Sequence, residues 1–255
     1  MAQRYAFEIA YNGNKFHGWQ IQPNALSVQE EIEMQLSKLF GNIPVSIVGC
    51  GRTDAGVHAS YYVFHADFEL EIEDTEQLVY KLNKMLSEDV VVFNCCSVSN
   101  DFHARFSALL RTYHYFVSFQ KKPFDKHCYY LNQQLDFELM NNAAKQLLGT
   151  QDFTSFSKLH TDVKTNICTV KKAVWRQYDT NTWVFEICAD RFLRNMVRAI
   201  VGTLIEVGMN KIDATELQSI IDAKNRSEAK LSVPAKGLFL ADVSYPQELF
   251  NRRKS

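Results

Sequence analysis

The chain has 255 residues, of which 46% are hydrophobic and 22% charged, and its formal net charge is −1 at pH 7. A chain of this length can bury a large core, as one large domain or two smaller ones. No stretch approaches the roughly 20 consecutive apolar residues of a transmembrane helix, and the first residues lack the pattern of a secretory signal. We therefore expect a cytoplasmic protein that does not contact a membrane.

The charge is unevenly distributed along the chain. Residues 1–100 carry 6 Lys and Arg against 13 Asp and Glu, whereas residues 101–255 carry 22 against 16. An average near neutrality does not prevent a local basic groove from binding phosphates. The basic surface is therefore predicted in the second part of the chain.

The first part of the chain has the predicted order strand, helix, strand, loop, strand, helix, strand. Its helices are predicted to start at Ser27 and near Asp74, because Glu30 and Gln77 stand in the capping-box position. The strands are predicted at 4–12, 44–50, roughly 60–69 and 90–98, from apolar alternation and β-branched or aromatic content. This order is that of a ferredoxin-like split unit.

The second part is similar in type. Its predicted strands lie at 109–119, 128–133, 166–178, 182–189 and 239–244, and its predicted helices at 137–148, 191–207 and 213–223. The sequence therefore predicts an α+β protein in two parts.

The octet Gly51–His58 is the most informative stretch of the sequence. It places a carboxylate, two possible cations and two glycines between two predicted strands. A short polar loop held by strands is a common position for chemistry, and glycine lets a ligand approach the backbone closely. The alternative is a β-turn in which Asp54 bonds its own backbone.

The sequence does not predict a metal or a cofactor. None of the six cysteines forms a C-x-x-C pair or has zinc-like spacing with histidine. No P-loop or dinucleotide fingerprint is present.

The string GRTDAGVHA closely resembles the catalytic loop of the tRNA pseudouridine synthase A (TruA) family. Further blocks resemble the family in its own order along nearly all of the chain. These blocks are Tyr11–Gly13, Phe16–Gln20, Asp101–Ser107, Arg111–Tyr115, Asp152–Phe156, Phe192–Arg198 and Gly237–Leu240. The segment Val233–Ala235 departs slightly from the family pattern. We expect this departure to affect packing and not the chemistry.

The resemblance implies an enzyme that isomerises uridine to pseudouridine at positions 38, 39 and 40 of the tRNA anticodon stem-loop, without a cofactor. It also implies a homodimer whose tRNA crosses both subunits. The implied fold has two ferredoxin-like (RRM-like) halves, residues 1–104 and 105–255, whose antiparallel sheets join around a central cleft. The first half would carry the catalytic loop and the second half the basic RNA-facing surface.

Asp54 is the first candidate catalytic residue. The reaction breaks the N1–C1′ bond and joins C1′ to C5, so the sugar must be activated while the base turns. A carboxylate can attack a sugar carbon or remove a sugar proton, and both roles need its ionised form. The resemblance assigns Asp54 as the essential acid but does not choose between these routes.

Arg198 and Tyr113 are the other candidate catalytic residues. A cation would keep Asp54 ionised in a water-poor cleft, and the family motif places a basic residue at Arg198. Arg194 lies four residues earlier and is expected on the same helical face, which could instead be a solvated face. The ring of Tyr113 can stack on uracil and its hydroxyl can bond the base edge. The alternative is that Tyr113, like Tyr115 on the same strand face, is a core residue.

Several further residues are predicted to contact RNA. Arg52 is expected to reach a phosphate or to help flip the target nucleotide, which cannot react while stacked. His58 could act as a base, but closure of the turn is the favoured interpretation. The segment from Phe102 to Phe106 mixes basic and aromatic residues, as RNA-contacting segments do. The complete set is Arg52, His58, Phe102, Arg105, Phe106, Arg111 and Arg194.

Two other functions remain open from the sequence. A non-catalytic RNA-binding protein could use the same sheets, although Asp54, Tyr113 and Arg198 are all present. A nucleoside hydrolase or glycosidase could use Asp54, but that chemistry usually needs two carboxylates and the motifs supply no second one.

Overall fold

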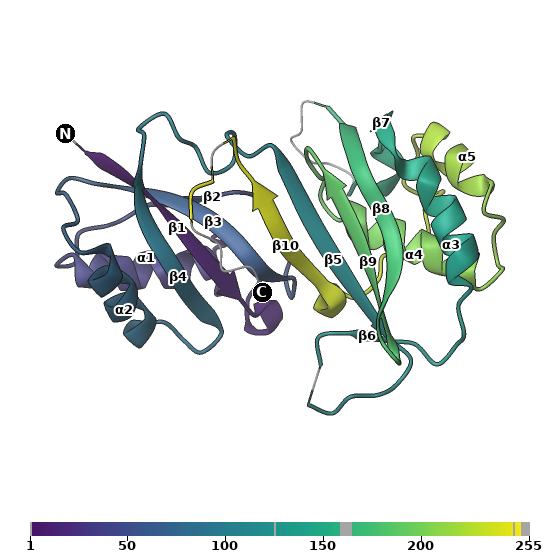
Figure 1. Cartoon of the computed structure of the whole chain (residues 1–255), viewed down its shortest axis with the longest axis horizontal. Helices are drawn as coiled ribbons and strands as arrows, with labels where there is room; N and C mark the ends of the chain where they lie inside the picture. The colour runs from purple at the N-terminus through teal and green to yellow at the C-terminus, as the bar shows by residue number, and fades with distance from the viewer. Residues whose placement is uncertain (1, 125, 159–164, 247, 251–255) are drawn as a thin grey trace. The chain divides into compact units, whose positions relative to one another are not determined.

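The computed structural model describes residues 2–124, 126–158, 165–246 and 248–250. The chain divides into two compact units, which are Met1–Leu109 with Leu240–Ser255, and Leu110–Phe239. We call them unit 1 and unit 2. Both mix helices with mostly antiparallel strands, as the α+β prediction requires (Figure 1). Within the described ranges, no helix is both long and apolar enough to cross a membrane.

Unit 1 begins with the predicted order of strands and helices. Its strands are β1 (Gln3–Tyr11), β2 (Ile47–Gly49), β3 (His58–Phe68) and β4 (Val90–Val98), joined by most of β10 (Leu238–Ser244). The sheet order is β4-β1-β3-β10, with β2 also paired to β3. Phe7 and Phe64 face each other in the β1–β3 register, and their rings stack at 4.6 Å. Aromatic pairs of this kind stabilise neighbouring strands.

Both helices of unit 1 start where the sequence predicts. The helix α1 (Val28–Leu39) is capped by Ser27, whose hydroxyl accepts the Glu30 N–H at 3.1 Å. The helix α2 (Thr75–Met85) is capped by Asp74, whose carboxylate accepts the Gln77 N–H at 2.8 Å. Such caps satisfy backbone donors that a helix leaves unpaired. These local signals confirm the predicted N-caps.

Unit 2 contains further strands and helices. Its strands are β5 (Leu110–Ser118), β6 (Tyr129–Tyr130), β7 (Gly149–Asp152), β8 (Ile167–Asp179) and β9 (Thr182–Ala189). Their order is β5-β9-β8-β7, and the short β6 runs parallel to β5. The helices are α3 (Phe137–Ala144), α4 (Met196–Gly208) and α5 (Glu216–Asp222). The sequence did not predict β7, because its residues are polar and few.

One helix prediction is wrong at its start. The helix predicted from residue 191 begins at Met196, and Asn195 before it has a left-handed φ of 66°. The side chain of Asn195 donates to the Ser232 hydroxyl at 2.6 Å, which holds this entry. Arg194 therefore lies outside the helix, and the prediction that it shares a helical face with Arg198 is wrong.

Smaller differences affect three other elements. The strand predicted at 44–50 has only three residues, and the one predicted at 128–133 has two. The helix predicted from Asp213 begins at Glu216. Asp213 and Glu216 do form a capping pair, since the Asp213 N–H donates to the Glu216 carboxylate at 3.0 Å. The local signal was therefore correct although the helix starts later.

Candidate active site

The octet Gly51–His58 connects β2 to β3 in unit 1. The Val57 N–H donates to the backbone carbonyl of Asp54 at 3.1 Å, which closes a turn. Gly56 lies within this turn at a φ of 75°, where glycine is favoured. The side chain of Asp54 is half-buried, and Arg52 is exposed. The octet therefore does contain a turn, and the backbone carbonyl of Asp54 closes it.

The motif Tyr11–Gly13 holds both ends of the octet. The hydroxyls of Tyr11 and Thr53 lie 2.8 Å apart, and the Gly13 N–H donates to Nδ1 of His58 at 3.0 Å. His58 is only 1% exposed. This placement makes His58 an anchor of the loop and supports the turn-closing interpretation over a role as a base.

The motif Phe16–Gln20 holds the middle of the octet. The Trp19 N–H donates to the Thr53 carbonyl at 3.3 Å, and the Gly56 N–H donates to the Phe16 carbonyl at 3.2 Å. Gly18 has a φ of 93°, and a Cβ atom added to it would lie 2.4 Å from the Thr53 carbonyl oxygen. Only glycine fits this position, so the N-terminal motif and the Asp54 loop are matched in shape.

Aromatic side chains support the start of the octet. The Tyr62 hydroxyl donates to the Gly51 carbonyl at 2.5 Å, and the Tyr62 ring stacks on Trp19 at 4.1 Å. Both rings are buried. The loop that presents Asp54 is therefore fixed from its start to His58 before any ligand binds.

Tyr113 and Tyr115 occupy different environments on β5 of unit 2. Tyr113 is half-buried, and its ring meets the Phe192 ring edge-on at 5.1 Å. Tyr115 is fully buried, and its hydroxyl donates to the Pro234 carbonyl at 2.8 Å. Burial raises the pKa of Tyr115 well above its usual value. Tyr115 is therefore a core residue, whereas Tyr113 lies at the edge of the core.

Arg198 lies on α4 and is bound to the segment after α5. Its Nε donates to the Val233 carbonyl at 2.8 Å, and its own backbone carbonyl accepts the Val233 N–H at 3.2 Å. The next carbonyl, that of Pro234, is the one that binds Tyr115. The consecutive carbonyls of Val233 and Pro234 thus bind Arg198 and Tyr115. The sequence could not reveal this role, because backbone atoms perform it.

The other basic candidates of unit 2 lie near the end of β9. Arg111 is half-buried, and its guanidinium donates to the Asp190 carbonyl at 2.9 Å. Arg194 is exposed, in the non-helical entry to α4. Phe192, which the sequence analysis did not assign as a site residue, contacts Tyr113 from the same entry. The sequence feature that could have identified Phe192 as a site residue is its place at the start of the family-like block Phe192–Arg198.

The segment Phe102–Phe106 belongs to unit 1. Phe102 is half-buried against Tyr245, with ring centres 5.3 Å apart. Arg105 is exposed, and Phe106 is 76% exposed. The structure therefore groups Asp54, Arg52, His58 and this segment in unit 1, and Tyr113, Arg111, Arg194 and Arg198 in unit 2.

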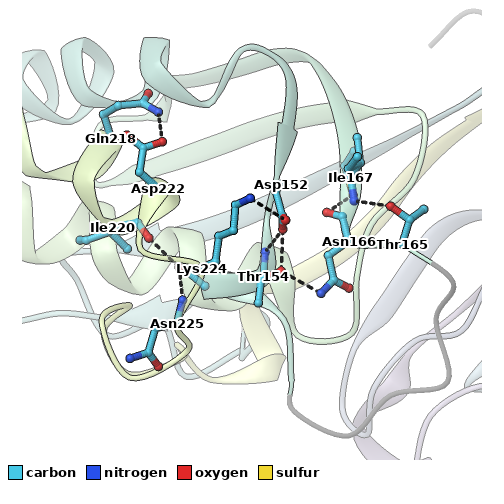
Figure 2. Close-up of polar contacts among 12 residues, drawn as sticks. Asp152, Thr154, Thr165, Asn166, Ile167, Gln218, Ile220, Asp222, Lys224 and Asn225 are labelled. Carbon is cyan, nitrogen blue, oxygen red and sulfur yellow. Dashed lines mark hydrogen bonds and ion pairs between the residues drawn. The ribbon is translucent and has the colours of Figure 1, made fainter.

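The block Asp152–Phe156 has a structural role in unit 2. Asp152 accepts bonds from the Thr154 N–H at 3.0 Å and from the Thr154 hydroxyl at 2.5 Å (Figure 2). Lys224, beyond α5, lies 3.5 Å from the same carboxylate. Burial would raise the pKa of Asp152, but the bonds from Thr154 and the charge of Lys224 lower it below its usual value. This carboxylate is committed to structure and does not supply the second acid of a glycosidase.

Ser155 in the same block fixes the end of α5. Its buried hydroxyl donates to the Ile220 carbonyl at 2.6 Å and accepts the Asn225 N–H at 2.9 Å. The block therefore joins the segment after β7 to α5.

Among the residues that the structure describes, no group of three or more His, Cys, Asp and Glu could hold a metal ion.

Comparison with known proteins identifies the class to which these motifs belong. Residues 9–107 and 143–246 match the family model described as tRNA pseudouridine synthase. The similar proteins narrow this class to one kind of tRNA pseudouridine synthase, named A. The chain is 51% identical over 249 residues to tRNA pseudouridine synthase A of Bacteroides fragilis, covering 97% of this chain and 98% of the relative.

Two further relatives agree. Identity is 52% over 249 residues to tRNA pseudouridine synthase A of Parabacteroides distasonis, covering 97% of this chain and 98% of the relative. It is 39% over 241 residues to that of Bacillus subtilis, covering 93% and 97%. The chain belongs to the tRNA pseudouridine synthase A family and is an isomerase that acts on tRNA.

Proposed function

We propose that this protein converts uridine to pseudouridine at positions 38, 39 and 40 of the tRNA anticodon stem-loop. The observation that carries this proposal is the Asp54 loop, which two motifs from the start of the chain hold in place. The match to relatives named tRNA pseudouridine synthase A along nearly the whole chain supports it.

In the proposed reaction, Asp54 acts on the sugar as an ionised carboxylate, by attack on C1′ or by removal of a sugar proton. The N1–C1′ bond breaks, the uracil turns, and C5 forms the new bond to C1′. C5 loses a proton and N1 gains one, so the reaction needs no second substrate. Arg198 favours the ionised form of Asp54. Tyr113 stacks on the uracil, and its hydroxyl relays the C5 proton, giving up its own proton as it accepts the one from C5.

The proposed fold brings these residues together. We take each half of the chain, 1–104 and 105–255, as ferredoxin-like, with sheets that join around a central cleft. The order β1-α1-β2-β3-α2-β4 supports this for the first half, with β1 paired to both β3 and β4 and with β2 paired to β3. This is the arrangement of a split β-α-β unit.

The remaining parts of the proposal concern the RNA and the assembly. Arg52 assists nucleotide flipping, and Arg111 and Arg194 contact phosphates, which position the RNA rather than read its sequence. The protein acts as a homodimer in the cytoplasm. The exposure of Arg52 and Arg194 supports their roles.

The test is tritium release from tRNA that carries uridine tritiated at C5. Joining C5 to C1′ must expel the label, so we expect release from wild-type tRNA. Release should fall stepwise in transcripts with cytidine at positions 38, 39 or 40. Binding without release would indicate a non-catalytic RNA-binding protein, and release of free uracil would indicate a hydrolase. Either result would refute the proposal.

Asp54→Asn supplies the matched variant. The change keeps the shape of the side chain and removes its charge, so turnover should vanish while tRNA binding remains. Turnover within about tenfold of the wild type, a barrier change of only ~1.4 kcal/mol, would remove Asp54 from the mechanism.

A further inference from the structure

The turn at residues 103–106 of unit 1 is held by its own first residue. Nδ1 of His103 accepts the N–H groups of Arg105 and Phe106 at 3.2 and 3.3 Å. The His103 carbonyl accepts the Ser107 N–H at 2.8 Å, and the Ser107 hydroxyl accepts the His103 N–H at 3.0 Å. These bonds fix the backbone, so the position of the side chains it carries does not depend on a ligand.

This turn presents one aromatic ring to solvent. Phe106 is 76% exposed, although an apolar side chain of this size is more often buried. The His103 ring lies against it with ring centres 4.3 Å apart, and the Arg105 guanidinium carbon lies 5.6 Å from the ring centre. An exposed ring with a neighbouring cation is the arrangement on which nucleobases stack next to a phosphate.

A second histidine lies beneath the turn. His65 on β3 is 3% exposed, and its Nδ1 accepts the Ala104 N–H at 3.1 Å. Its ring also meets the His103 ring at 5.0 Å. The pKa of His65 is lowered to about 4, chiefly by burial and also by Arg4 and His103, while Asp67 opposes the shift. His65 is therefore neutral at pH 7 and keeps the lone pair that the Ala104 N–H needs.

Bonds from the two chain ends complete this support. Arg4 on β1 binds both carboxylate oxygens of Asp67, at 2.7 and 2.8 Å, and donates to the Phe102 carbonyl at 2.7 Å. The Tyr245 hydroxyl donates to the Ala104 carbonyl at 2.7 Å. Both backbone polar groups of Ala104 are thus bound to side chains from distant parts of unit 1.

We propose that residues 103–106 form a nucleobase-stacking platform, on which an unstacked base of the RNA substrate lies against Phe106 while Arg105 meets a neighbouring phosphate. His65 is a positioning residue that holds the platform at Ala104. This inference rests on the proposed function only in taking tRNA as the ligand.

Phe106→Ala tests the stacking. Removal of the ring should weaken binding of a fluorescently labelled tRNA by about 5- to 150-fold, the range measured for loss of one base–aromatic stack. The slope of log affinity against log salt should not change, because no phosphate contact is lost. Phe106→Tyr keeps the ring and should bind within about threefold of the wild type.

Tyr80→Ala is the matched control. Tyr80 on α2 is 64% exposed and has the Lys84 ammonium 5.4 Å from its ring centre, so it repeats the exposed ring and cation away from the turn. Its removal should leave tRNA binding unchanged. Equal losses in Phe106→Ala and Tyr80→Ala would overturn the proposal, as would an unchanged affinity in Phe106→Ala.

Arg105→Gln separates charge from stacking. It should reduce the salt slope by about 0.7–0.9, the value for one released counterion. An unchanged slope would remove the phosphate contact from the proposal.

His65 is tested by two variants. His65→Asn retains an acceptor near the position of Nδ1, whereas His65→Leu removes it. We expect His65→Leu to weaken tRNA binding and His65→Asn to restore most of it, with both variants folded by circular dichroism. His65→Leu should also add little to Phe106→Ala, since both changes act on the same stack. Full additivity would overturn the positioning role.

These binding measurements are independent of the tritium assay. Wild-type protein that binds tRNA without releasing tritium would contradict the proposed function and leave the platform testable. Wild-type turnover together with unaffected binding by Phe106→Ala would contradict the platform and leave the proposed function standing.

Discussion

Gly18→Ala should displace the loop that carries Asp54. Gly18 lies at a φ of 93° beside the octet, and an added Cβ atom would lie 2.4 Å from the Thr53 carbonyl oxygen and 3.2 Å from the Asp54 carbonyl carbon. Both neighbours are backbone atoms, which cannot move aside as the end of a flexible side chain can. The substitution therefore acts on the candidate catalytic loop without removing any of its side chains.

The size of the displacement follows from these distances. Ordinary contact begins at 3.4 Å, so the Thr53 carbonyl must retreat by about 1 Å from its position at 2.4 Å. A misplacement of ~1 Å in an active site can cost about 100-fold in rate. The left-handed backbone adds a penalty of about 1–2 kcal/mol to folding, because alanine disfavours that region. We therefore expect kcat to fall about 100-fold and stability to fall by at least ~1 kcal/mol.

The assay is tritium release under saturating tRNA, combined with urea denaturation and a tRNA binding isotherm. Gly41→Ala is the control, because Gly41 has a similar φ of 72° but nothing within 4 Å of an added Cβ atom. It carries the same backbone penalty at the end of α1, away from the octet. Gly41→Ala should lose about 1–2 kcal/mol of stability and keep its kcat.

Two results would refute this reasoning. A kcat for Gly18→Ala within about threefold of the wild type would show that the loop tolerates the displacement, since 1 Å was expected to cost far more. An equal loss of activity in both variants would show that general destabilisation, not the position of Asp54, limits the rate.

Tyr113→Phe should reduce turnover by at least ~100-fold, the lower range for a proton-transferring group, while tRNA binding and thermal stability stay near wild type; an active variant would remove the hydroxyl from the mechanism. Tyr115→Phe should instead keep its rate and lose about 0.5–1.5 kcal/mol of stability in urea, because it removes the hydrogen bond to the Pro234 carbonyl. Ser155→Ala should lose about 1–3 kcal/mol, since the buried hydroxyl bonds both the Ile220 carbonyl and the Asn225 N–H, with kcat per folded molecule unchanged; an unaltered denaturation midpoint would contradict the structural role of that block. Affinity for tRNA should fall linearly with log salt, as counterion release requires, and a salt-independent affinity would argue against a phosphate-binding surface. Sedimentation should give a dimer at micromolar concentration, and a monomer there would exclude the proposed assembly.

The helix starts show which structural features are local. Ser27 and Asp74 cap their helices through bonds to residues three positions ahead. The information for such a bond lies within one turn of helix, so a capping box read from sequence predicts it. The start of α4 differs, because Asn195 is held by Ser232, which lies 37 residues away. Apolar residues before Asn195 continue the helical pattern, and only the folded unit shows that they form a non-helical entry to α4.

The candidate site also combines features that the local sequence predicts with features that depend on distant contacts. The residue types of the octet, with Asp54 between two glycines, indicate its chemistry without a structure. Its shape depends on Tyr11, 42 residues before Thr53, and on Gly13, 45 residues before His58. For His58 the sequence favours turn closure over a role as a base, and its buried position and bond to Gly13 support that interpretation.

The two tyrosines of β5 mark the limit of the sequence most clearly. Alternation along a strand places Tyr113 and Tyr115 on one face, and the family resemblance assigns the substrate to the first. The sequence by itself determined the family, the order of the elements other than β7, and the residue types that can carry out the chemistry, because these follow from local pattern and residue type. Only the tertiary structure decided that Tyr115 is a core residue, because its hydroxyl binds Pro234, 119 residues along the chain. Burial is set by contacts between distant segments, and no local pattern contains them.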